Sequence, residues 1–212
     1  MKSATKHAEE LRSLFKKLLK ETKPAPKERQ EPLKALVRGA MSFDVSDARA
    51  ADAVKAIDKE FVDLNELRVA TDLEIQELLG VRYPQIERRV AMITQSLNAI
   101  FEKEHTLNLD RLATLSKRDA RQFLRDLPDV HPFVEAYVML YAFDGHTVPT
   151  DEQTVEYLKG EGVLEPDTDV VEAQKFLEHH VKAEECHDFY VAVRVAAASA
   201  ASDEKKKKKA KA

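Results

Sequence analysis

Cysteine, glycine and tryptophan are scarce in this chain, and each scarcity excludes something. The 212 residues include one cysteine, five glycines and no tryptophan. The lone Cys186 excludes an internal disulfide, which fits a reducing cytoplasm. Few glycines predict few tight turns and so favour helices over sheets. No apolar run approaches the roughly 20 residues that span a bilayer, so we expect a cytoplasmic protein without membrane association.

Charge is distributed unevenly behind a net charge of −4. Residues 1–34 hold ten basic and five acidic residues, and residues 203–212 hold six lysines and two acids. By contrast, residues 126–188 hold 16 acidic and three basic residues. This acidic segment repels a phosphate backbone and is a candidate face for a protein partner. The lysine-rich end, 203–212, is predicted to be a disordered tail that binds polyanions weakly.

Apolar residues recur at helical spacing along nearly the whole chain, and no segment reads convincingly as a strand. Capping signals support several helix starts, such as Thr71 with Glu74 and Thr150 with Gln153. The sequence therefore predicts an all-α protein of about ten helices, near 5–21, 31–42, 46–61, 63–69, 71–79, 82–104, 116–125, 132–143, 150–160, 168–182 and 183–200.

One arrangement of motifs stands out near the middle of the chain. Leu127-Pro-Asp-Val-His131 reads as a tight turn between two helices, and Val148-Pro-Thr-Asp151 then places an acid at the start of the next helix. This layout resembles the helix-hairpin-helix DNA glycosylase superfamily, of which endonuclease III is the best-known member. Its pattern is roughly L-P-G-V-G-x-K-T-A, followed about twenty residues later by V-D-T-H.

The resemblance extends in the same order over roughly residues 33–195. It includes the segment from Leu33 to Asp47, the stretch around Leu78-Leu-Gly80 and Tyr83, and the approach from Leu112 to Arg125. It implies an all-α, two-domain fold that binds a DNA lesion between the domains. We expect a central domain at 33–145 and a second domain built from 1–32 and 146–202.

Two chemical features of the family are changed here. The family hairpin uses glycines so that backbone N–H groups approach a phosphate closely, but Asp129 and His131 occupy both glycine positions. The lysine that attacks the sugar in bifunctional members aligns with Phe133, so lyase activity is not expected. Leu127, Pro128 and Val130 complete the hairpin that would touch the DNA backbone. The same residues also suit a plain turn between helices.

The chain has an acid where the family has its catalytic aspartate. Asp151 matches the aspartate that stabilises positive charge on the departing nucleoside or activates the nucleophile. It also suits an ordinary helix start, where acids favour the helix dipole. Met41 falls where the family often has a residue that fills the gap left by a flipped base, although a methionine on a helix stripe is more often part of the core. The candidate DNA-contacting cations are Arg38, Arg121 and Arg125, joined by Arg88 and Arg89 if a positive cleft forms around Asp151.

We expect no cofactor and no metal. One cysteine cannot hold the four-cysteine iron–sulfur cluster of many endonuclease III relatives. The other polar group, His179, His180, Cys186 and His187, lacks the spacing that brings all four side chains to one ion.

Two functions remain open, each for a monomer. One is a catalytically degraded glycosylase relative. It binds either double-stranded DNA or a protein partner, and the protein partner would bind the acidic segment 126–188. The alternative is an active monofunctional DNA glycosylase in base excision repair that uses Asp151 and lacks lyase activity. In either case, a protein that binds DNA would be associated with the nucleoid. The missing lysine, the missing glycines and the acidic body favour the degraded relative.

Overall fold

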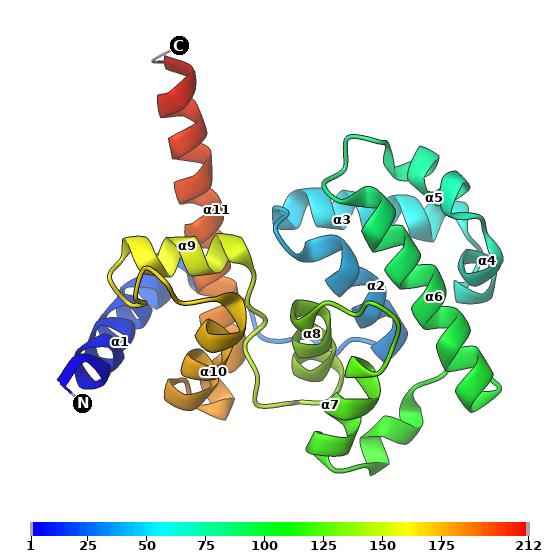
Figure 1. Cartoon of the computed structure of the whole chain (residues 1–212), viewed down its shortest axis with the longest axis horizontal. Helices are drawn as coiled ribbons and strands as arrows, with labels where there is room; N and C mark the ends of the chain where they lie inside the picture. The colour runs from blue at the N-terminus through cyan, green and yellow to red at the C-terminus, as the bar shows by residue number, and fades with distance from the viewer. Residues whose placement is uncertain (1, 211–212) are drawn as a thin grey trace. The chain divides into compact units, whose positions relative to one another are not determined.

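The fold is entirely helical in the part of the chain that the structure describes. This computed structural model describes the backbone of residues 2–210 and the side chains of residues 6–202 (Figure 1). Its α-helices are α1 (Lys2–Thr22), α2 (Pro32–Ser42), α3 (Asp47–Glu60), α4 (Leu64–Val69), α5 (Asp72–Leu79), α6 (Ile86–Glu104), α7 (Lys117–Arg125), α8 (Pro132–Ala142), α9 (Glu152–Gly160), α10 (Val170–His180) and α11 (Cys186–Ala210). Two 3₁₀-helices, η1 (Asp110–Thr114) and η2 (Ala183–Glu185), complete it.

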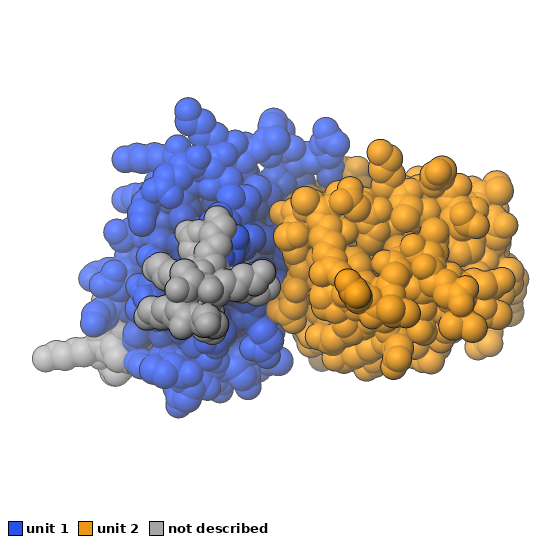
Figure 2. Space-filling view, turned by 90° about the horizontal axis from the view of Figure 1, so that it is seen from above, with its two compact units in different colours: residues 1–28, 146–212 blue, residues 29–145 orange. Residues whose placement is uncertain are grey.

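The chain forms two compact units, each with its own core. Unit 2 is a continuous segment, residues 29–145, whereas unit 1 combines residues 1–28 with residues 146–212 (Figure 2). Both ends of the chain therefore belong to the same unit. No described helix combines the length and apolar character that a membrane crossing requires.

Unit 2 is built around α8, which packs against α2 and α7. Ten of the eleven residues of α8 are buried, so this helix is surrounded rather than amphipathic. Gly39 of α2 allows a close approach to α8, because a Cβ atom there would meet the Cβ of Tyr137 at 3.3 Å. The helix that follows the hairpin turn is thus the fixed centre of unit 2.

Unit 1 is held together by α11, which packs against both α1 and α9. The rings of Phe15 and Phe189 meet edge to face with centroids 5.2 Å apart. Leu11, Leu14 and Leu18 of α1 are buried. These contacts join the two ends of the chain into one core.

Three local features differ from the sequence-based expectation. The helix near 150–160 begins after Asp151, which is its N-cap, while the hydroxyl of Thr150 donates to the carbonyl of Val148. The helix expected at 82–104 begins only at Ile86, so Pro84 precedes α6 instead of lying in its first turn. The expected disordered tail continues α11 as far as Ala210, since no glycine or proline interrupts the helix from Cys186 onward.

Candidate functional site

Asp151 caps α9, the helix that follows α8. Its Oδ1 accepts hydrogen bonds from the backbone N–H of Thr154 at 2.9 Å and from the Thr154 hydroxyl at 2.7 Å. The backbone of Asp151 is extended, with φ −123°, as is usual for an N-cap residue. A short acid in this position satisfies one of the N–H groups that the first turn of α9 leaves unpaired.

The second oxygen of the same carboxylate is engaged by an arginine that the sequence analysis missed. Arg194 of α11 donates from its Nη1 to Oδ2 of Asp151 at 3.1 Å. The two side chains are 5% and 1% exposed, so the ion pair is buried within unit 1. A hint was present in the sequence, where Arg194 is the one charged residue in the apolar run 191–198. A buried charge of this kind requires a partner.

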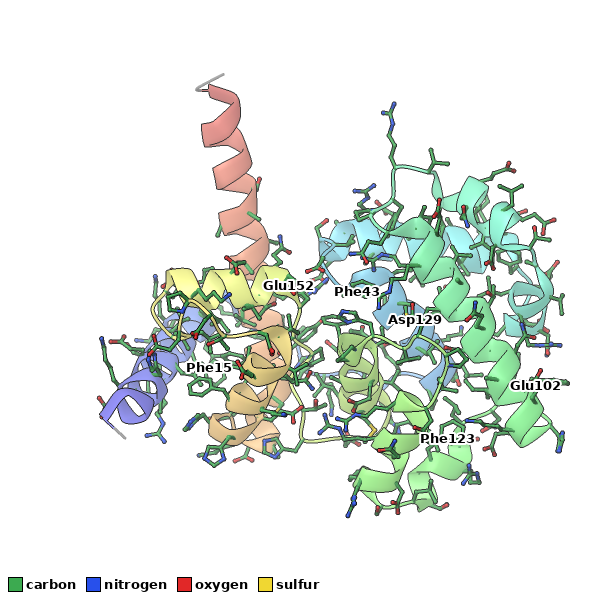
Figure 3. All side chains as sticks on the ribbon, in the orientation of Figure 1. Phe15, Phe43, Glu102, Phe123, Asp129 and Glu152 are labelled. Carbon is green, nitrogen blue, oxygen red and sulfur yellow. The ribbon has the colours of Figure 1, made fainter. Side chains whose placement is uncertain are left out.

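The hairpin turn keeps the backbone shape that glycine would provide, but with an acid. Asp129 has φ +50°, in the left-handed region that Asn and Asp tolerate better than other non-glycine residues. Its carboxylate receives two hydrogen bonds from the Arg88 guanidinium of α6, at 3.1 and 3.3 Å. Asp129 lies on the side of the hairpin that faces α6 (Figure 3). The charge at the turn is therefore partly compensated by a second element of unit 2.

The start of α8 is also closed to an anion. His131 is the N-cap residue, and its Nδ1 accepts a hydrogen bond from the backbone N–H of Phe133 at 3.2 Å. Pro132 has no N–H to offer. The His131 ring stacks on Phe43 with centroids 4.4 Å apart, which fixes this arrangement. Phe133, at the position of the family's lysine, is fully buried.

The expected DNA-contacting arginines of α7 are paired with a buried acid. Arg121 and Arg125 contact the two oxygens of Glu135, with Nε–O distances of 2.6 and 3.1 Å. The Glu135 side chain is 2% exposed, which makes α8 the anchor for both guanidinium groups. Sequence reasoning missed Glu135 because it sits within the apolar pattern of α8.

The remaining predicted residues of unit 2 separate into two kinds. Arg89 and Met41 are completely buried, and Arg89 donates hydrogen bonds to three backbone carbonyls. Met41 therefore reaches DNA only if it leaves the core. Arg38 is partly exposed and makes no ion pair with another described residue. Of the five arginines considered from the sequence, Arg38 is the one whose guanidinium has neither an ion pair nor a hydrogen bond with another described residue.

The polar group around Cys186 does not converge. Among the described residues, no three His, Cys, Asp or Glu side chains lie close enough to hold a metal ion. Burial and the neighbouring Glu178 raise the pKa of Cys186 to about 12, so its thiol stays protonated at neutral pH. Burial, followed by His179 and Arg12, lowers the pKa of His180.

Two open grooves on unit 2 contain none of the predicted site residues. One, of about 560 Å³, is lined by four glutamates and by apolar side chains that include Phe61, just after α3, Val69 of α4 and Leu78 of α5. The other, of about 570 Å³, lies between the start of α2 and the α3–α4 connection. No residue of the hairpin turn, 127–131, lines either groove.

Solved structures of DNA glycosylases share this fold. A trapped covalent complex of endonuclease III with DNA is 16% identical, with a TM-score of 0.69, over 88% of this chain and 84% of that one. The 8-oxoguanine glycosylase/lyase of Clostridium acetobutylicum, in complex with double-stranded DNA, is 16% identical, with a TM-score of 0.71, over 92% and 70%. The 3-methyladenine glycosylase MagIII of H. pylori is 15% identical, with a TM-score of 0.65, over 90% and 94%.

These likenesses define the class of fold, which is that of the helix-hairpin-helix DNA glycosylases. No family model matches the sequence, and no curated protein sequence matches it. The predicted all-α glycosylase-like fold is confirmed. At identities of 15 to 16%, the likeness concerns the fold and leaves the chemistry to the residues themselves.

Proposed function

We propose that this protein binds the phosphate backbone of duplex DNA and does not excise bases. The observation that supports the loss of catalysis most strongly is the state of Asp151. One oxygen is held by Thr154 and the other by Arg194 in a buried pair. A carboxylate stabilises a departing nucleoside through its uncompensated negative charge. An adjacent guanidinium opposes that charge.

The first turn of α8 supports the same proposal. A lyase step needs an amine that attacks the sugar, and the corresponding position holds the buried ring of Phe133. DNA as the ligand is supported by the fold, since endonuclease III and the C. acetobutylicum enzyme with this fold are solved as DNA complexes. The proposed activity is therefore DNA binding without chemistry.

A monofunctional glycosylase is the second candidate, and the position of Asp151 favours it. The acid stands at the start of the helix that follows α8, as in the family pattern. For catalysis, Oδ2 would have to exchange Arg194 for the substrate. The two candidates differ in one measurable outcome, the release of a base.

We expect no base release by the wild-type protein. Duplexes carrying 8-oxoguanine, 3-methyladenine, 1,N⁶-ethenoadenine or a thymine mismatch would be incubated with excess protein in single-turnover assays. Asp151→Asn serves as the matched variant, because it keeps the size of the side chain and an oxygen for Thr154. Since losing the pair with Arg194 destabilises this variant, the assay is run at a temperature at which it is still folded. Release by the wild type that disappears in Asp151→Asn, with the fold retained by circular dichroism, would establish the glycosylase instead.

The hairpin gives a second prediction under this proposal. Replacing Asp129 by glycine should strengthen duplex binding about fivefold, or roughly 1 kcal/mol, because it removes a negative charge and frees Arg88. Asp129→Asn also removes the negative charge, so it should give most of the same gain, and it differs from glycine in keeping a Cβ atom at the left-handed position. Anisotropy titrations of a labelled duplex measure both. Unchanged affinity in both variants would place the hairpin away from the bound DNA.

A further inference from the structure

The apolar face of α1 packs within unit 1 along its described residues. Leu11, Leu14 and Leu18 are buried, and Phe15 packs on Phe189 of α11 (Figure 3). A basic amphipathic helix can insert in a membrane interface or pack on a partner through its apolar face. Neither mode is open to α1, because α11 already covers that face. Only the polar face remains for an interaction.

That polar face is strongly basic over its second half. Residues 12–23 hold five basic residues and one acid, Glu21. The cations of this second half that lie on α1 are Arg12, Lys16, Lys17 and Lys20, which we call the α1 basic face. All four are exposed, and none makes an ion pair with another described residue. Arg12, Lys16 and Lys20 follow one another at intervals of four residues and so form a row along the helix.

Helix stability alone does not account for this row. A cation in the last turn, such as Lys20, is favoured by the helix dipole. Arg12 and Lys16 lie further from the helix end, and like charges four residues apart destabilise a helix by roughly 0.2–0.5 kcal/mol per pair. Glutamates at these positions would have given favourable pairs instead. The repulsion is relieved when an anion lies along the row.

We propose that the α1 basic face binds the phosphate backbone of duplex DNA. Consecutive residues of the row are about 6 Å apart along the helix axis. Phosphates of one DNA strand recur every 3.4 Å or so along the duplex axis, so each step covers about two nucleotides. Flexible lysines recognise phosphates and not base edges, which makes the contact independent of sequence.

This assignment rests on the proposed function for the identity of the polyanion. It also offers a source of positive charge that the hairpin turn of unit 2 lacks. The hairpin turn carries Asp129, and the N–H of Phe133 is already bonded to His131. The backbone contact that the family resemblance implies for the hairpin is thus weakened. The α1 basic face supplies positive charge from a different element.

The test is the salt dependence of duplex binding by the full chain. A fluorescent 20-base-pair duplex is titrated at 50 to 200 mM NaCl with the wild type and with a variant carrying Arg12→Gln, Lys16→Gln, Lys17→Gln and Lys20→Gln. Glutamine is nearly as good a helix former as lysine, so α1 should persist. We expect an affinity about 10- to 100-fold lower at 100 mM salt and a slope of log K against log salt that is shallower by about three.

A matched variant separates the location of the charge from its amount. Four exposed cations of unit 2, Lys34, Lys55, Lys59 and Arg82, are replaced by glutamine for the same change in net charge. The assignment is overturned if this control loses as much affinity for the duplex as the α1 variant. It is also overturned if neutralising Lys205 to Lys209 lowers the affinity and the α1 variant does not. If the α1 variant binds like the wild type, the assignment fails while the proposed function stands. If the wild type binds no duplex, both fail.

Discussion

Replacing Arg194 by methionine is expected to lower the free energy of unfolding by about 3–5 kcal/mol. The change leaves the Asp151 carboxylate, 1% exposed, without the cation that compensates it. Methionine has a similar length and is apolar, so the cost arises from the stranded charge more than from a cavity. Urea titrations followed by far-ultraviolet circular dichroism measure the difference.

The companion variants determine what the pair does. Asp151→Asn alone removes the carboxylate that pairs with the buried Arg194 and should also destabilise the protein strongly. The double variant, Arg194→Met with Asp151→Asn, should recover much of the lost free energy of unfolding, because both charges of the pair are then absent. The double-mutant cycle gives the coupling energy between the two side chains. A loss below about 1 kcal/mol in Arg194→Met would show that Asp151 does not depend on Arg194. The carboxylate would then be available for chemistry.

The same pair shows how far sequence reasoning reaches. The acid of α9 was found from its place after the hairpin, and the helices were found from apolar spacing and caps such as Thr71 with Glu74, which forms a complete capping box. These signals are local, since they depend on residues three or four apart. The all-α glycosylase-like fold followed from their order along the chain.

The partners of the site residues carry no such local signal. Arg194 is 43 residues from Asp151, and Arg88 is 41 residues from Asp129. Each pair forms only after two helices pack, and no periodicity connects them. The sequence therefore predicted which residues would form the candidate site but not their ion-pair partners, which meet only through tertiary packing. For this reason arginines that look like DNA contacts in the sequence prove to be engaged within unit 2.

Arg89 is the most demanding of these arginines, and Arg89→Met is expected to destabilise the protein by about 3–5 kcal/mol. Its guanidinium is fully buried and donates to the carbonyls of Pro84, Ala40 and Phe43 at 2.6 to 2.7 Å. It also lies over the Phe43 ring, 3.7 Å from the centroid. Each buried carbonyl that loses its donor costs roughly 1–3 kcal/mol, and relaxation recovers part of the total.

The neighbouring Arg88 is a matched control on the same helix. Its pair with Asp129 is exposed, at 46% and 56%, so Arg88→Met should cost less than about 1 kcal/mol. Arg89→Lys keeps the positive charge but loses the planar fork, and should recover only part of the stability lost in Arg89→Met. Thermal and urea unfolding of the three variants would give this order. Equal effects at Arg88 and Arg89 would contradict it, because the end of α2 would then not depend on the buried guanidinium. The expected order instead means that Arg89 fixes the end of α2 and Phe43. The Phe43 ring in turn holds His131, the N-cap residue that closes the start of α8.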